Sequence, residues 1–143
     1  MIFPVLLFTC LAAGFASACP DAKFFRGDIS TPTSWEGTVR LTGPVVIQPG
    51  ITVTVEPGTR VLVRPQRDPG IVVRGRLFVR GLQIKPVLFE SDGGCSVGSW
   101  GGIVFERGSA GILEDVKIRC SPQGVGGDLK GVTAKNVVRE SAR

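Results

Sequence analysis

Residues 43–63 read GPVVIQPGITVTVEPGTRVLV, in which short runs of β-branched residues alternate with Pro-Gly bends. Within 51–55, apolar residues alternate with threonines, as in a strand that buries one face. Proline fixes φ and glycine readily adopts positive φ, so each Pro-Gly pair bends the chain sharply. The stretch therefore predicts short strands that each end in a sharp bend.

The same pattern continues along the rest of the chain. Its turns carry Pro-Gly pairs or a single glycine, whereas hairpins favour Asn-Gly or Asp-Gly between paired strands. A chain that bends every few residues and always buries one side can coil into a solenoid of parallel strands, with repeats of roughly 20–30 residues. No stretch has a convincing helical period. Further strands are expected at 59–64, 71–75, 76–81, 86–90, 102–106, 112–119 and 131–138.

Four motifs follow one another in a specific order. They are Pro57-Gly58-Thr59, Leu77-x-Val79-x-Gly81, Pro86-Val87-x-Phe89 and Trp100-x-Gly102-Ile103-x-Phe105. In this order they resemble the parallel β-helix repeats of bacterial surface and periplasmic proteins with the pectin-lyase-like fold. The resemblance covers 43–120 well and 121–138 weakly. It implies an all-β, right-handed parallel β-helix, which the strand count makes short, at roughly four to five coils.

The chain divides into four expected segments: a leader (1–18), an N-terminal capping segment (19–43), the β-helix (44–138) and a C-terminal tail (139–143). Trp35 is expected to cover the N-terminal end, because terminal coils otherwise expose strand edges and core. At the other end no covering helix is evident. Either the tail folds over the last coil, or the protein associates end to end, or the chain belongs to a longer β-helix.

Residues 1–18 are uncharged, largely apolar and end in Ala16-Ser17-Ala18, a small-x-small cleavage pattern. They predict a signal peptide, and hence a protein that is secreted, periplasmic or at the cell surface. The alternative is a membrane anchor, but a spanning helix needs about 20 apolar residues. Cys19 follows directly, and the segment resembles the lipobox of bacterial lipoproteins, so Cys19 is a candidate for lipidation. Otherwise Cys19 is free or pairs elsewhere.

Removal of the leader would leave three cysteines, Cys19, Cys95 and Cys120. Exported proteins favour paired thiols, and Cys95 and Cys120 are about one coil apart in the β-helix interpretation. We therefore expect a Cys95–Cys120 disulfide, worth about 3 kcal/mol. Three scattered cysteines without any histidine do not have the spacing of a zinc site, so no metal is expected.

The chain carries a formal charge of +5, and several of its arginines lie in or beside predicted strands. If outward positions stack, they form a stripe that attracts acidic polysaccharides, phosphate-rich envelope polymers or anionic lipid heads. The alternative is a basic surface interspersed with acids. Trp100 is expected to be structural, with sugar stacking as the alternative. The candidate binding residues are Arg60, Arg64, Arg74, Arg76, Arg80 and Trp100.

The acidic residues are thinly spread. Glu114-Asp115 is the only adjacent pair, Glu90 and Asp92 are the only other close spacing, and no motif of the resembled family covers them. Without histidine there is no Ser-His-Asp or Cys-His arrangement. We expect no catalytic residue, no cofactor and no nucleic-acid partner, with the membrane reached only through a lipid on Cys19.

The function that follows is a non-enzymatic, exported β-helix protein of the cell envelope, a structural or binding module for a polysaccharide or protein. Fold alone does not decide this, because the resembled fold carries lyases, hydrolases, adhesins and inert spacers. The alternatives are a polysaccharide lyase-like enzyme and a fragment of a larger surface protein without a task of its own.

Overall fold

A computed structural model describes residues 22–140, which form twelve β-strands and no helix. The expected signal peptide (1–18) and the lipidation candidate Cys19 lie outside these residues. Among the described residues, no helix is long and apolar enough to cross a membrane. The strands are β1 (Ala22–Ile29), β2 (Thr33–Trp35), β3 (Thr38–Ile47), β4 (Thr52–Val55), β5 (Arg60–Val63), β6 (Ile71–Val73), β7 (Arg76–Arg80), β8 (Val87–Ser91), β9 (Ile103–Phe105), β10 (Ala110–Arg119), β11 (Val125–Gly127) and β12 (Val132–Glu140).

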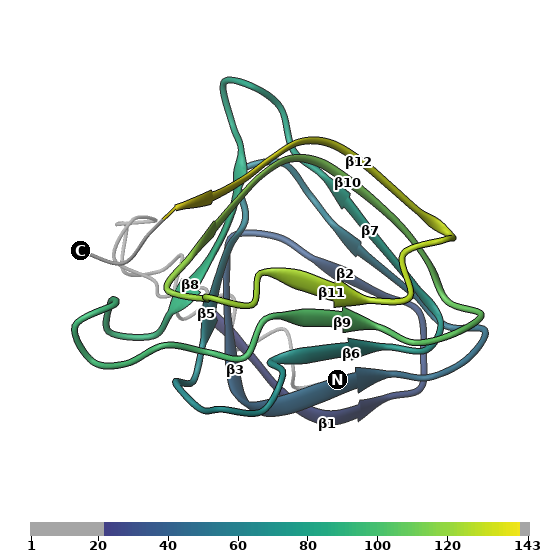
Figure 1. Cartoon of the computed structure of the whole chain (residues 1–143), viewed down its shortest axis with the longest axis horizontal. Coiled ribbons are helices and arrows are strands. Elements are labelled where there is room, and N and C mark those ends of the chain that lie inside the picture. Colours follow the sequence, from purple (N-terminus) through teal and green to yellow (C-terminus); the bar gives the residue numbers. More distant parts are fainter. Residues whose placement is uncertain (1–21, 141–143) are drawn as a thin grey trace, which may run out of the picture.

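All pairings between these strands are parallel, and they gather the strands into three faces around one interior (Figure 1). Face 1 contains the first halves of β1 and β3, then β5, β8 and the second halves of β10 and β12. Face 2 contains the second halves of β1 and β3, then β6, β9 and β11. Face 3 contains β2, β4, β7 and the first halves of β10 and β12.

This topology confirms the all-β class and the parallel pairing, and it is compatible with a parallel β-helix. Every strand between the two ends of the stack pairs with strands from the preceding and following passes, as a solenoid requires, whereas β1, β2, β11 and β12 each pair on one side only. Two of the three Pro-Gly bends work as expected, because Gly50 and Gly58 have positive φ angles of 81° and 80°. Gly70 differs, because its φ is not positive.

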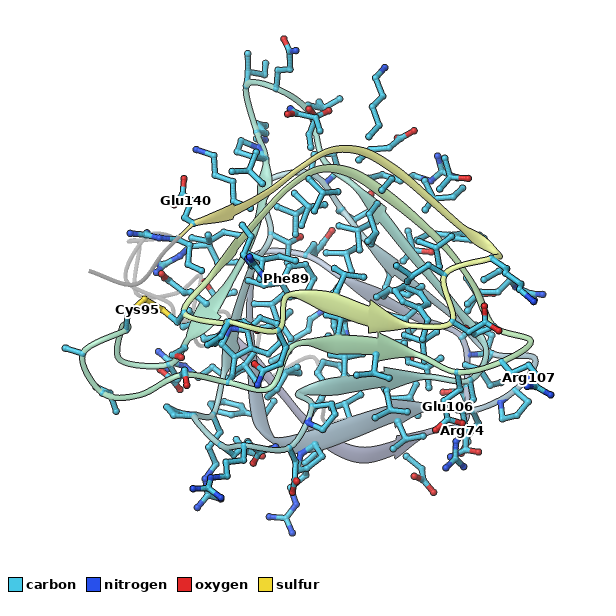
Figure 2. All side chains as sticks on the ribbon, viewed as in Figure 1. Arg74, Phe89, Cys95, Glu106, Arg107 and Glu140 are labelled. Carbon is cyan, nitrogen blue, oxygen red and sulfur yellow. A yellow bond between two sulfur atoms is a disulfide. The ribbon has the colours of Figure 1, made fainter. Side chains whose placement is uncertain are left out.

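The core consists of like positions stacked through the parallel register. On face 1, one such column runs Val39, Val61, Phe89 and Ile118, all of them buried. Burial alternates along the strands, for example in β3, where every second residue is buried. Figure 2 shows the Phe89 side chain pointing into this interior. The apolar β-branched residues of the sequence therefore form one continuous core between the three faces.

The parallel strands begin at Ala22, inside the segment 19–43 that was expected to be a cap. There β1 pairs with β3, and β2 pairs with β4. Trp35 is fully buried at the end of β2, and its ring lies 5.3 Å from that of Phe25. At the other end, β12 extends to Glu140, into the expected tail 139–143, and most of its residues are exposed.

The Cys95–Cys120 disulfide is confirmed, with a Cα–Cα distance of 5.0 Å. Cys95 lies in the long loop after β8, and Cys120 directly follows β10. The bond therefore fastens the largest loop of the molecule to the next pass of the chain.

Candidate binding surface

The five arginines predicted to form a stripe do not stack on one another. They lie between 60 and 80, within one pass of the chain through faces 1, 2 and 3. The register places Arg60 between Thr38 and Leu88, and Arg76 between Thr52 and Ala110. The expectation of a single arginine stripe is therefore wrong, because a stripe needs residues one full coil apart.

The five side chains instead make separate local contacts. Arg60 and Arg74 are paired with carboxylates, at 3.0 Å from Glu90 and 3.0 Å from Glu106. Figure 2 shows Arg74 beside Glu106 at a corner of the molecule far from Cys95. The other three meet no carboxylate: Arg76 donates to the Thr52 hydroxyl, Arg80 lies over the Phe78 ring, and Arg64 Nη1 donates weakly to the Thr42 carbonyl at 3.5 Å.

Face 1 carries a set of ion pairs that the sequence did not reveal. Glu90 contacts Arg60 at 3.0 Å and Arg119 at 3.5 Å, and Arg119 contacts Glu140 at 3.1 Å. The Glu90 side chain is only 13 % exposed, which shields its contacts from water. We call Arg60, Glu90, Arg119 and Glu140 the ion ladder. Its members lie one coil apart, so only the register could have identified them.

Trp100, a candidate binding residue in the sequence, lies in the core instead. It is 1 % exposed, stacks on Phe89 with a ring distance of 6.2 Å and donates its indole N–H to the Arg119 carbonyl at 2.8 Å. A side chain buried in this way has no face to offer a sugar ring. Its contacts are those of a core residue, in agreement with the expectation that Trp100 is structural.

The closely spaced acids are engaged in structural contacts rather than gathered into one cluster. Glu90 belongs to the ion ladder, and Asp92 pairs with Arg40 at 2.5 Å. Asp115 has a positive φ of 52° at the bend of β10 and accepts a hydrogen bond from Asn136. Glu114 lies in register between Arg80 and Lys135. Three of these four acids thus contact side chains of other segments.

Between faces 1 and 2 lies a corner made of loops, which we call the loop corner. It comprises residue 26 of β1, the bulge 42–44 of β3 opposite it, and the segments 64–70 and 92–102. Two shallow grooves open there. One, of about 360 Å³, is lined by Arg26, Gly27, Thr42, Gly43, Pro44, Arg64 and Gln66. The other, of about 310 Å³, is lined by Leu41, Thr42, Arg64, Pro65 and Asp92.

Sequence reasoning found Arg64 but missed Arg26 and Gln66. Arg26 was passed over because it lies in the segment expected to be a cap. Gln66 lies in a turn, where a polar residue draws no attention.

No protein-family model, curated protein or solved structure matches this chain. The fold assignment consequently depends on the parallel pairing itself, and the function has to be argued from the side chains of the described surface.

Proposed function

We propose that this chain is a non-enzymatic, exported protein of the cell envelope that acts as a binding module for an acidic polysaccharide. We further propose that its stack is a short right-handed parallel β-helix of the pectin-lyase-like type, with roughly four to five coils. The observation that carries the binding role is the position of Arg26 and Arg64. Both are exposed, both line one groove, and neither makes an ion pair with any residue of the described chain.

Charge supports a polyanionic partner. The formal charge of the chain is +5, and its ion pairs concentrate on face 1 and at the Arg74–Glu106 corner. The arginines that remain unpaired leave a positive field, which attracts polyanions and accelerates their association. Arginine suits this role because its planar guanidinium matches the geometry of a carboxylate.

Export is supported by the disulfide together with the leader pattern of residues 1–18. Disulfides persist in oxidising compartments outside the cytosol. Mass spectrometry of the mature N-terminus from the native host tests this part of the proposal. A chain that begins at Cys19, with or without a lipid, is expected, and a chain that still begins at Met1 would contradict export.

A binding rather than catalytic role is supported by the contacts of the acids. Glu90, Asp92 and Asp115 are each bound to an arginine or an amide, so they tie strands together. The polysaccharide lyase-like alternative would require some of these groups to act on a substrate, which would disrupt those contacts.

Affinity electrophoresis tests the proposed function. The protein is run through gels that contain sodium polygalacturonate or neutral dextran at low ionic strength. We expect the acidic polymer alone to retard the protein, and added salt to weaken the retardation because charges are screened. Shortening of the polygalacturonate during incubation would establish an enzyme instead. Equal mobility in both gels would remove the binding role and favour a fragment without a task of its own.

A further inference from the structure

We propose that the groove between Arg26 and Arg64 is the site that holds the carboxylate groups of the acidic polysaccharide. This inference rests on the proposed function and adds the residues and the chemical group that they recognise. We call the groove lined by Arg26, Gly43, Arg64 and Gln66 the arginine groove.

The two arginines flank an open floor. Arg26 of β1 lies opposite the bulge 42–44 of β3, and Arg64 directly follows β5 on the other side of that bulge. Neighbouring strands are about 4.8 Å apart, so the two backbones are separated by roughly 10 Å. Gly43 occupies the middle without a side chain, and a Cβ placed there would come within 4 Å of a single atom, Arg26 Cβ, at 3.5 Å. An anionic group thus has room between two guanidinium groups.

The groove offers hydrogen-bond donors without a neutralising acid. Guanidinium groups only donate, and no carboxylate of the described residues lines this groove; Asp28 and Asp68, the nearest described acids along the chain, are not among its lining residues. Gln66 lines the same groove, but its Nε2 is buried and is out of reach of a ligand there. The two guanidinium groups therefore favour an oxyanion as the ligand.

The neighbouring groove indicates that the ligand is a chain carrying hydroxyl groups. The two grooves share Thr42 and Arg64, so together they form a longer path around the loop corner. The second groove adds Leu41 and Pro65, which are apolar, and Asp92, which can accept a hydrogen bond from a hydroxyl group. A phosphate-rich polymer has no apolar ring face for Leu41 and Pro65, whereas a polysaccharide presents carboxylates, hydroxyls and apolar ring faces together. This combination favours the polysaccharide over a phosphate polymer or a lipid head.

The test compares variants at the groove with a matched variant elsewhere. Arg26→Gln and Arg64→Gln each remove one charge at the groove, and Gly43→Glu places a carboxylate in its floor. Arg80→Gln removes the same charge on face 3, where Arg80 lies over Phe78. Binding to sodium polygalacturonate, dextran sulfate and neutral dextran is measured by affinity electrophoresis and isothermal titration calorimetry. Far-UV circular dichroism and thermal melting establish that each variant folds.

We expect each arginine variant to weaken polygalacturonate binding about tenfold, since a hydrogen bond to a charged group is lost. Gly43→Glu should abolish binding, and Arg80→Gln should stay within about twofold of the unchanged protein because its contribution is only long-range. Should Gly43→Glu fail to fold, the two arginine variants decide the matter alone.

Four outcomes would overturn the arginine groove. Undiminished binding by both arginine variants would place the site elsewhere while leaving the proposed function intact, and an equal loss in Arg80→Gln would show that only net charge matters. Binding to dextran sulfate but not to polygalacturonate would remove the carboxylate as the recognised group. If the unchanged protein binds no acidic polymer, the proposed function and the groove fail together.

Discussion

The ion ladder on face 1 and the arginine groove at the loop corner use the same residue type in opposite ways. In the ladder, Arg60 and Arg119 both reach Glu90, and Arg119 also reaches Glu140. In the groove, Arg26 and Arg64 reach no carboxylate of the described chain. The two regions are adjacent on the same passes of the chain. Their arginines therefore differ in pairing for a reason other than their distance apart along the chain or the residue type.

The difference follows from the register. On face 1 the strands are matched position by position, so an acid on one strand lies beside a base on the next. At the loop corner the connections lengthen from 42–44 to 64–70 and then to 92–102, and few matched positions remain, such as the parallel bridge between Gln66 and Trp100. Arginines on the regular face therefore hold the stack together, while Arg26 and Arg64 at the irregular corner are available to a ligand.

The largest effect is expected where the two regions are joined. The Cys95–Cys120 bond fastens the loop 92–102 to the end of β10, next to Arg119 of the ion ladder. We expect the Cys95→Ala/Cys120→Ala variant to lose about 3 kcal/mol of unfolding free energy, because the unfolded chain is no longer cross-linked. Urea denaturation checks this, and reduction of the unchanged protein should reproduce the loss. A loss below about 1 kcal/mol would show that the loop is held by its packing alone.

A smaller effect is expected within the ladder. Glu90→Gln should lower the unfolding free energy by about 1–2 kcal/mol, because a carboxylate shielded from water would no longer neutralise two arginines. Its matched control is Glu106→Gln, which breaks the Arg74 pair. There both side chains are 44–47 % exposed, and the expected loss is at most about 0.5 kcal/mol. Equal losses in the two variants would contradict the special position of Glu90 in the stack.

The smallest effect is expected at the arginine groove. Arg26→Gln and Arg64→Gln should change the unfolding free energy by less than about 0.5 kcal/mol, because exposed side chains without an ion-pair partner contribute little to stability. Thermal melting of these two variants and of Glu90→Gln under the same conditions compares their losses of stability directly. A loss as large as that of Glu90→Gln would mean that the groove arginines are structural, and the contrast between the two regions would disappear.

Much of the fold was readable from local sequence. The alternation in 51–55 and the Pro-Gly bends at Gly50 and Gly58 depend on backbone geometry a few residues long, which a sequence displays directly. The Cys95–Cys120 pair was readable because only a few cysteines had to be matched. These features need no knowledge of which strands lie side by side.

The candidate site was less accessible because it depends on register. Successive coils differ in length. One column of matched positions runs Thr38, Arg60, Leu88 and Lys117, and the number of residues between its members is not constant. The expected repeat length already placed Arg60 to Arg80 within about one pass, against the stripe, but sequence spacing could not show that Glu90 meets Arg119. Arg26 was missed for a related reason, since the bulge of β3 opposite it depends on how β1 and β3 pair, which the sequence does not show.

In-register parallel stacking is the central claim, and an engineered disulfide tests it most directly. Thr54, Phe78 and Ile112 are successive members of one column on face 3. Neighbours in the column are about 4.8 Å apart, within the Cα range of a disulfide, whereas next-nearest members are roughly 10 Å apart and outside it.

The measurement is mass-spectrometric mapping of disulfides after mild oxidation. The account predicts a bond in Thr54→Cys/Phe78→Cys and none in Thr54→Cys/Ile112→Cys. A bond in the second pair but not in the first would contradict the stack, and with it the ion ladder and the arginine groove.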